Sequence, residues 1–196
     1  MPLAIDMIRS EHRTMAKLLD LLERQIDLFE KTGEPDYDLL GEIVDYFRSF
    51  PDLYHHPKED LIFAYLSKRA PDAVAEFGDL EAEHEKVNAR LNRFARAVVN
   101  VLMQVEVPRE AFVRLAREFI LGERKHMQAE ETLFFPLALE KLDEADWAEI
   151  DARIARFKDP LLETQAPHRY AALQEQLTHW RGEPAPAARP QEATGG

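Results

Sequence analysis

The feature that most constrains this chain is a set of histidine motifs that occurs twice. Glu11-His12 recurs as Glu83-His84, a shift of 72 positions, and His55–Glu59 recurs as His126–Glu130, a shift of 71 positions. Seven histidines placed at random would not be expected to keep this register twice. The repeat indicates one helix-pair unit that is used twice, with each copy contributing nitrogen and carboxylate groups.

The composition favours a single, mostly helical domain with appendages, because 45% of the 196 residues are hydrophobic and only 7 are glycine. The 37 acidic and 25 basic side chains give a net charge of −12. This charge disfavours nonspecific binding to nucleic acid and attachment to an anionic membrane. We therefore expect neither nucleic acid nor a membrane as a partner, and the sequence leaves any protein partner unknown.

The chain contains no cysteine, which excludes disulfides and thiolate metal ligands. Any redox chemistry therefore requires a bound cofactor. The first residues lack a basic segment followed by an apolar run, and nowhere does the sequence hold the 18 or more consecutive apolar residues typical of a membrane-spanning helix. In the absence of such signals we expect a cytoplasmic protein.

The spacing of apolar residues predicts the first two long helices. Steps of three and four residues over positions 8–29 are typical of one buried helical stripe, and the glycine and proline within 32–36 end that helix. The second helix contains Pro51 and Pro57. Each proline lacks an amide hydrogen and crowds the carbonyl four residues back, so we expect a kink or a restart over 54–57.

Two further long helices and a shorter one complete the expected architecture. The third is predicted to begin after Asp72 and to end before residue 108, with Phe77 and His84 on its inward stripe. The fourth is predicted over 108–141, and its inward positions include the histidine of the second repeat. A shorter amphipathic segment follows, from about residue 146 to 157. The sequence therefore predicts an all-α protein.

A single histidine on an apolar face is usually a hydrogen-bonded core residue. Four inward histidines on four successive helices are different, because burying them without a common partner leaves several donors or acceptors to satisfy. A shared metal site removes that difficulty. In addition, a histidine and a glutamate four residues apart lie on the same helix face, so one helix offers both a nitrogen and a carboxylate.

The donor types narrow the choice of metal. Imidazole and carboxylate without thiolate suit iron, manganese or zinc, and we favour iron. Six ligands are too many for one tetrahedral zinc and suit two six-coordinate ions with bridging carboxylates. Four imidazoles, two bridging carboxylates and one bridging oxygen leave two open positions. A fifth imidazole from His56 would leave one, which favours end-on binding of a small diatomic ligand.

These motifs resemble those of the hemerythrin-like (HHE cation-binding) domains. The resemblance covers roughly residues 1–142 and is carried by Glu11-His12, by 55–60 with Phe63 after it, by Glu83-His84 and by 126–136. It implies an up-down-up-down four-helix bundle that encloses a non-heme centre of two oxygen-bridged iron ions. The implied metal ligands are His12, His55, Glu59, His84, His126 and Glu130, with the two glutamates as bridges.

Beyond residue 142 we expect a short C-terminal helical extension over 143–182 and a disordered tail over 183–196. The tail is rich in proline, alanine and glycine and cannot bury a core. His168 and His179 lie outside the repeat and are not expected to bind metal.

The chain departs from the oxygen-carrying hemerythrins, which have a His-x-x-x-His pair on the third helix. Here the residue four positions after His84 is Asn88, and the residue four positions before it is Leu80. The adjacent His55 and His56 also leave the register open. The repeat favours His55 with Glu59, and the kink expected near Pro57 keeps His56 as a possible further ligand.

A ferritin-like di-iron bundle is the rival metal interpretation, because Glu81-x-x-His84 and Glu123-x-x-His126 both have its Glu-x-x-His spacing. That architecture leaves the inward positions of His12 and His55 unexplained, so we favour the hemerythrin-like site.

Three functional classes remain open, because one fold and one metal site support several tasks. The resemblance to the hemerythrin-like domains implies one of their functions: members of that family bind dioxygen reversibly, sense oxygen or iron, or act on nitric oxide and peroxide. The first class is therefore a di-iron protein that binds or senses dioxygen or a related small ligand. The second is a di-iron enzyme acting on peroxide or nitric oxide. The third is a helical interaction module with a structural metal or none.

Overall fold

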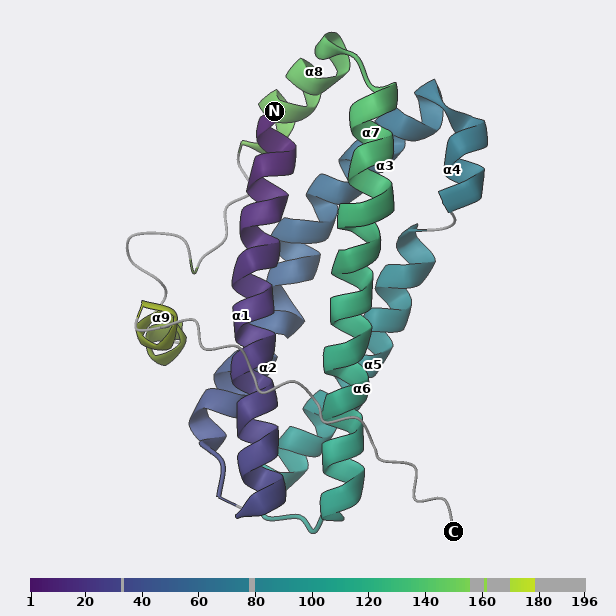
Figure 1. Cartoon of the computed structure of the whole chain (residues 1–196). Helices are drawn as coiled ribbons and strands as arrows, with labels where there is room; N and C mark the ends of the chain where they lie inside the picture. The colour runs from purple at the N-terminus through teal and green to yellow at the C-terminus, as the bar shows by residue number, and fades with distance from the viewer. Residues whose placement is uncertain (33, 78–79, 156–160, 162–169, 179–196) are drawn as a thin grey trace, which may run out of the picture.

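The computed structural model describes residues 1–32, 34–77, 80–155, 161 and 170–178, and all regular structure within them is helical (Figure 1). Four long helical runs lie side by side, and the chain reverses direction between successive runs. The all-α class predicted from the sequence is confirmed. The runs are α1 (Leu3–Lys31); α2 (Tyr37–Phe50), η1 (Pro51–His55) and α3 (His56–Arg69); α5 (Leu80–Leu102); and α6 (Arg109–Ala129), η2 (Glu130–Phe134) and α7 (Phe135–Lys141).

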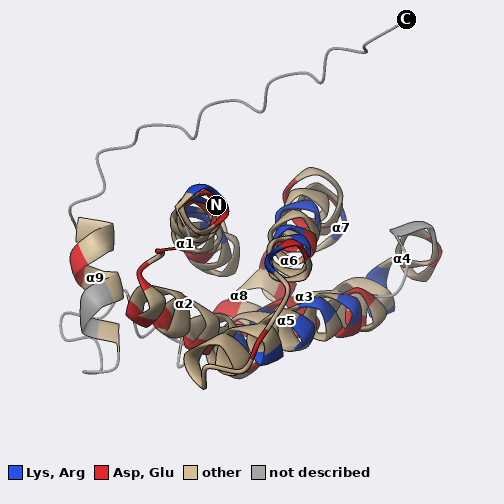
Figure 2. Ribbon diagram, turned by 90° about the horizontal axis from the view of Figure 1, so that it is seen from below, with Lys and Arg blue, Asp and Glu red and all other residues tan. Residues whose placement is uncertain are grey.

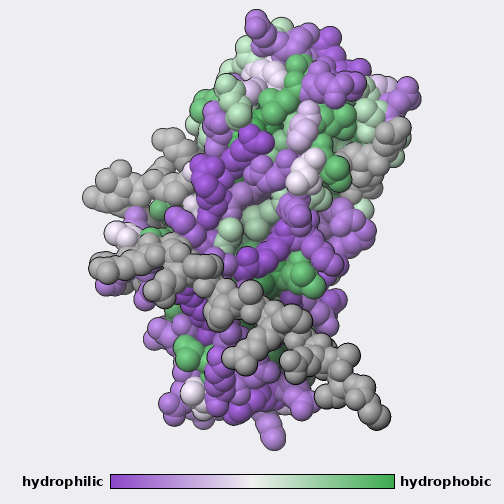
Figure 3. All heavy atoms as spheres, in the orientation of Figure 1, coloured by the Kyte–Doolittle hydropathy of each residue, from purple (hydrophilic) through white to green (hydrophobic). Residues whose placement is uncertain are grey.

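The runs form a closed ring, in which α5 packs against α6, α6 against α1, α1 against α2, and α2 against α5. Three shorter helices lie outside this ring, and they are α4 (Pro71–Phe77), α8 (Glu144–Ile154) and α9 (Ala171–Thr178). Figure 2 views the bundle from one end and shows α9 beside α1 and α2, the helices that it contacts. The face shown in Figure 3 is mostly hydrophilic, with small hydrophobic patches between polar side chains. No described helix has a segment long and apolar enough to span a bilayer.

Two of the long runs contain a π-helical turn just before a proline. The amide of His56 donates to the carbonyl of Pro51 across η1, and Pro57 follows. The amide of Phe135 donates to the carbonyl of Glu130 across η2, and Pro136 follows. Because a proline supplies no amide hydrogen and crowds the preceding turn, widening that turn keeps the run helical. The kink expected over 54–57 therefore takes the form of a π-helical turn, and the turn at η2 was not predicted.

The prediction of one continuous third helix is wrong. The segment divides into α4 and α5, and α4 packs against α3. Residues 78–79, between the two helices, lie outside the described part. The sequence has glycine and aspartate at these two positions, and both residue types disfavour a helix interior. The side chain of Phe77, expected on the inward stripe, also lies outside the described part.

Two apolar clusters fill the bundle. Between them lies a layer of buried polar side chains that includes His12 and His84, called here the polar level. The smaller apolar cluster contains Ile8 of α1 and Leu80 of α5, together with buried residues of α3, α7 and α8. The larger apolar cluster contains Met15 and Leu91, farther along α1 and α5 in the chain direction. The histidines of α1 and α5 lie between these positions, so both helices pass from one apolar cluster to the other through the polar level.

The C-terminal helices pack on both clusters. Trp147 and Ile150 of α8 are buried in the smaller apolar cluster, and an Asp143 capping box starts this helix. Near α9, Tyr170 and Leu173 are buried in the larger apolar cluster. Helix α8 therefore contributes to the bundle core. The expected tail over 183–196, and the two histidines expected not to bind metal, lie outside the described residues.

We expect Ile150→Ala to lower the free energy of unfolding of the metal-free protein by about 2–5 kcal/mol, because it opens a cavity at a fully buried position. Urea unfolding measures this change. Leu121→Ala is the control, since Leu121 is 55% exposed and its truncation should change the stability by no more than about 0.5 kcal/mol. Equal effects of the two substitutions would show that α8 is not part of the bundle core.

Candidate metal centre

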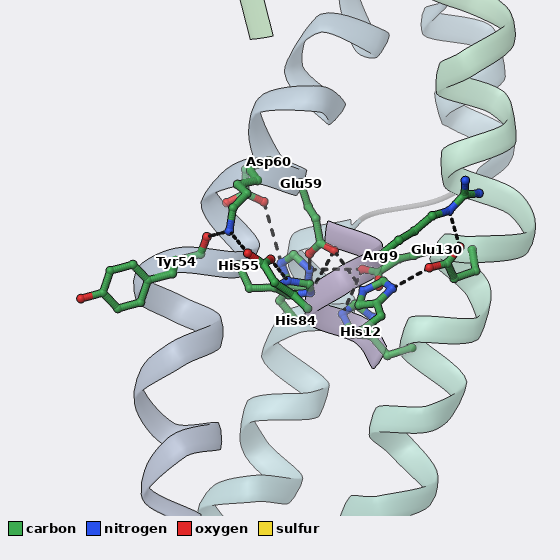
Figure 4. Close-up of polar contacts among 12 residues, drawn as sticks. Arg9, His12, Tyr54, His55, Glu59, Asp60, His84 and Glu130 are labelled. Carbon is green, nitrogen blue, oxygen red and sulfur yellow. Dashed lines mark hydrogen bonds and ion pairs between the residues drawn. The ribbon is translucent and has the colours of Figure 1, made fainter. Parts of the chain in front are cut away.

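The six side chains predicted as metal ligands come together at the polar level between the two clusters. All six are buried, and each of the four long runs contributes at least one (Figure 4). They are His12 of α1, His55 at the end of η1, Glu59 of α3, His84 of α5, His126 near the end of α6 and Glu130 at the start of η2.

The side chains form two groups that share Glu59. One group contains His12, His55, Glu59 and Glu130, and the other contains His56, Glu59, His84 and His126. Within each group, the candidate ligand atoms all lie within 4.8 Å of one another. All five histidines of the described residues belong to these groups. His56, which the sequence left undecided, is therefore at the site.

Each glutamate presents its two oxygens to different histidines. The Oε1 of Glu59 is 3.1 Å from the Nε2 of His55, and its Oε2 is 3.4 Å from the Nε2 of His84. The Oε2 of Glu130 is 3.3 Å from the Nε2 of His12, and its Oε1 is 3.1 Å from the Nε2 of His126. Both carboxylates thus lie between the same two pairs of imidazoles, as bridging ligands of two cations do.

The atoms that face the centre have no hydrogen-bond partner. Eight buried side-chain atoms among the described residues are unsatisfied, and all belong to this site: the Nε2 atoms of His12, His55, His84 and His126 and the four oxygens of Glu59 and Glu130. Leaving one buried polar atom unsatisfied costs about 1–3 kcal/mol, so eight at one place call for a common partner. Imidazole nitrogens and carboxylate oxygens all donate electron pairs to a cation. The residues therefore fit a metal centre.

Three of the imidazole rings are held by carboxylates that lie outside the centre. In each ring the carboxylate contacts Nδ1, on the side away from the centre. The Nδ1 of His12 is 3.0 Å from Glu131, and the Nδ1 of His55 is 2.9 Å from Glu11. The Nδ1 of His56 is 3.1 Å from Asp52. Because an ionised carboxylate only accepts hydrogen bonds, the proton of each neutral ring is on Nδ1, and Nε2 keeps a free electron pair. This arrangement prepares the rings to bind a cation through Nε2.

A buried ion pair supports His55 from behind. The Nζ of Lys58 is 2.7 Å from Oε1 of Glu11, and Lys58 also donates to the carbonyl of Tyr54. Lys58 and Glu11 are 0% and 2% exposed. The sequence singled out Glu11 only through its match with Glu83 and did not single out Lys58. The matched Glu11 and Glu83 differ in their surroundings, because Glu11 is buried and Glu83 is exposed.

Opposite charges set the proton affinities of the site. Burial by itself lowers the pKa of His55 and His84, but the facing carboxylates raise them to about 9 and about 10, respectively. Burial likewise opposes ionisation of Glu59, yet the positive charge on His55 and the close approach of the surrounding imidazoles hold its pKa well below the usual value. Protons therefore balance the carboxylates in the metal-free protein, and a metal ion has to displace them.

The structure does not support the ferritin-like alternative. Glu81 is exposed, and neither Glu81 nor Glu123 belongs to either group of candidate ligands. Glu123 is nevertheless buried, and burial raises its pKa to about 7. The sequence identified this residue only as part of the rival motif.

Two hollows in the surface reach the site. A cavity of about 310 Å³ between α5 and α6 is lined by His126 and Glu130, with Leu80 and Leu133 among its apolar residues. A more open depression of about 310 Å³ between α1 and α6 reaches His12. Small molecules therefore have two approaches to the centre.

Comparisons with known proteins agree with this geometry. The sequence model described as the hemerythrin HHE cation binding domain matches residues 3–138, which include every side chain of both groups. An uncharacterized protein from Haemophilus influenzae (strain ATCC 51907 / DSM 11121 / KW20 / Rd) is 26% identical over 132 residues. The aligned region covers 66% of this chain and 76% of that protein.

We expect the metal-free protein to lose stability as the pH rises from about 6.5 to about 10. His55 and His84 bind protons more tightly in the folded protein than in the unfolded chain, since their folded pKa values exceed the unfolded value of 6.5. Their contribution is therefore complete below pH 6.5 and is lost as the pH passes the folded values. Urea unfolding of chelator-treated protein across this range measures the effect. A free energy of unfolding that stays constant or rises would contradict it.

We expect Lys58→Met to lower the free energy of unfolding by about 3–5 kcal/mol, because it leaves the Glu11 carboxylate buried without its cation. Adding Glu11→Gln should recover part of the loss, since the amide is neutral and its oxygen still accepts from His55. Lys86→Met is the control, because Lys86 and its partner Glu83 are more than half exposed. The account of this pair fails if urea unfolding shows equal losses for Lys58→Met and Lys86→Met.

Proposed function

Because the chain belongs to the hemerythrin HHE cation-binding domain family, we propose that it is a non-heme di-iron protein that binds or senses dioxygen or a related small ligand. One observation carries the proposal. Eight buried, unsatisfied atoms converge at one place, and they are four imidazole nitrogens and the four oxygens of two glutamates. In this assignment His12 and His55 would hold one iron, and His84 and His126 would hold the other. Glu59 and Glu130 would supply the carboxylates shared by the two.

The donor set supports iron over the common alternatives. Calcium and magnesium prefer oxygen ligands and do not need four imidazoles. A structural zinc site takes four ligands in a tetrahedron, whereas the two groups here bring together seven side chains. Two six-coordinate ions with bridging carboxylates accommodate all of these side chains and still leave room for a small ligand.

The bound iron pair would supply open coordination positions and the capacity to exchange electrons with the small ligand. The protein supplies the surroundings. The two apolar clusters above and below the polar level limit access of water, and the carboxylates behind His12 and His55 fix the orientation of those rings. The cavity between α5 and α6, whose lining includes the apolar Leu80 and Leu133 and the charged Arg90 and Lys125, gives a small molecule an approach to His126.

An enzyme that acts on peroxide or nitric oxide is the second candidate. The observation that favours it is Glu123, three positions before His126 on α6. Its carboxyl group is 2% exposed, and burial raises its pKa to about 7. A group with this pKa gives up and takes back a proton near neutral pH, which reduction of peroxide or nitric oxide requires.

The test begins with protein that is expressed with iron and purified under nitrogen. We expect two irons per chain and an optical spectrum that changes on exposure to air and returns when oxygen is removed. Glu59→Gln and Glu130→Gln should lose iron, because each removes a bridging carboxylate. Glu81→Gln should keep it, since Glu81 is exposed and outside both groups.

Turnover separates the two candidates. Binding without consumption of peroxide or nitric oxide supports the binder or sensor. Turnover that is lost in Glu123→Gln, while the two irons are retained, supports the enzyme. One zinc per chain, or no metal after iron loading, would rule out both and leave a helical interaction module.

A further inference from the structure

His56 is built into the centre even though its neighbour His55 completes the repeated motif. The His56 side chain is 8% exposed. Its ring stacks on the ring of His84, with a centroid distance of 3.9 Å and an interplanar angle of 13°, and meets His126 edge to face. A candidate ligand atom of His56 lies within 4.8 Å of those of Glu59, His84 and His126.

The two adjacent histidines serve different halves of the site. Successive side chains on a helix project about 100° apart, so neighbouring residues face different directions. His55, at the end of η1, faces the group that contains His12. His56, at the start of α3, faces the group that contains His84 and His126. Together the two histidines extend over both halves.

The far side of the His56 ring is fixed in the same way as those of His12 and His55. Its Nδ1 lies 3.1 Å from Oδ1 of Asp52, one turn earlier on the same run. The same oxygen accepts a hydrogen bond of 3.1 Å from the side-chain amide of Asn88 on α5. Asp52 is therefore held from two sides. Because the ionised carboxylate accepts a hydrogen bond from the Nδ1–H group, the Nε2 of a neutral His56 ring keeps a free electron pair.

We infer that His56 is a fifth imidazole ligand, on the iron that His84 and His126 hold, and that Asp52 and Asn88 position its ring. This inference rests on the proposed di-iron function and adds an asymmetry to it. One iron has three imidazoles, whereas the iron at His12 and His55 has two. With both carboxylates bridging, the iron at His12 and His55 would have one fewer protein ligand.

Iron retention tests this assignment. His56→Gln removes the imidazole and keeps a polar side chain of similar length. In competition with a chelator, we expect the wild type to hold two irons per chain and His56→Gln to release one of them at least tenfold more readily. Iron loading should also raise its melting temperature by less than it raises that of the wild type. Equal melting temperatures of the two metal-free proteins exclude a folding defect.

Two further kinds of variant test the assignment through iron binding. One lacks the His56 imidazole, and the other lacks the carboxylate that orients it. Added imidazole should restore to His56→Ala the iron that is assigned to His84 and His126. Asp52→Ala should weaken iron binding by about 10–100-fold, as the loss of a residue that orients a metal-binding histidine does. Asp52→Asn should remain near the wild type, because its amide oxygen still accepts from Nδ1. Asp45→Ala removes an exposed carboxylate from α2 and serves as the control for charge.

Mössbauer spectra of the loaded proteins complete the test. We expect two distinct iron sites in the wild type and a change in only one of them in His56→Gln. If the wild type holds two irons, and His56→Gln matches it in affinity and spectrum, the assignment of His56 is overturned and the di-iron proposal stands. A wild type that holds no iron pair would overturn both.

Discussion

The structure depends on a concentration of buried electron-pair donors at one level of a helical bundle. Two glutamates and four imidazoles point eight unsatisfied atoms toward one another between apolar clusters. Without a cation these atoms keep only protons to balance them, which is why the pKa values of His55 and His84 rise while that of Glu59 falls. A pair of metal ions would satisfy the same atoms directly, which would couple metal binding to the stability of the fold.

The second layer of contacts explains why the donors keep their positions. Glu131, Glu11 and Asp52 each hold one imidazole by its Nδ1. Lys58 in turn neutralises the carboxylate of Glu11 inside the bundle. These residues also make the two halves of the site unequal, because the buried Lys58 and Glu11 pair lies behind His55, whereas the matching Glu83 is exposed. The sequence repeat is therefore approximate, and the centre that it builds is asymmetric.

The regular spacing of apolar residues and of the histidine motifs made the long helices and the meeting of four histidines predictable from the sequence. The inward stripes indicated long helices, and the matched motifs indicated that His12, His55, His84 and His126 meet at one place, where the structure brings them together. Their role as iron ligands remains a prediction. The π-helical turns were beyond the sequence pattern, because they depend on how each run accommodates a proline beside the site. The importance of Lys58 was also hidden, since only its burial distinguishes it from a surface lysine.

The most direct test of the central claim is an anomalous difference map, recorded at the iron absorption edge from crystals of the iron-loaded protein. The account predicts two peaks at the polar level, one beside His12 and His55 and the other beside His84 and His126, with Glu59 and Glu130 between them. A single peak at this level, or none in crystals of protein shown to carry iron, would contradict it.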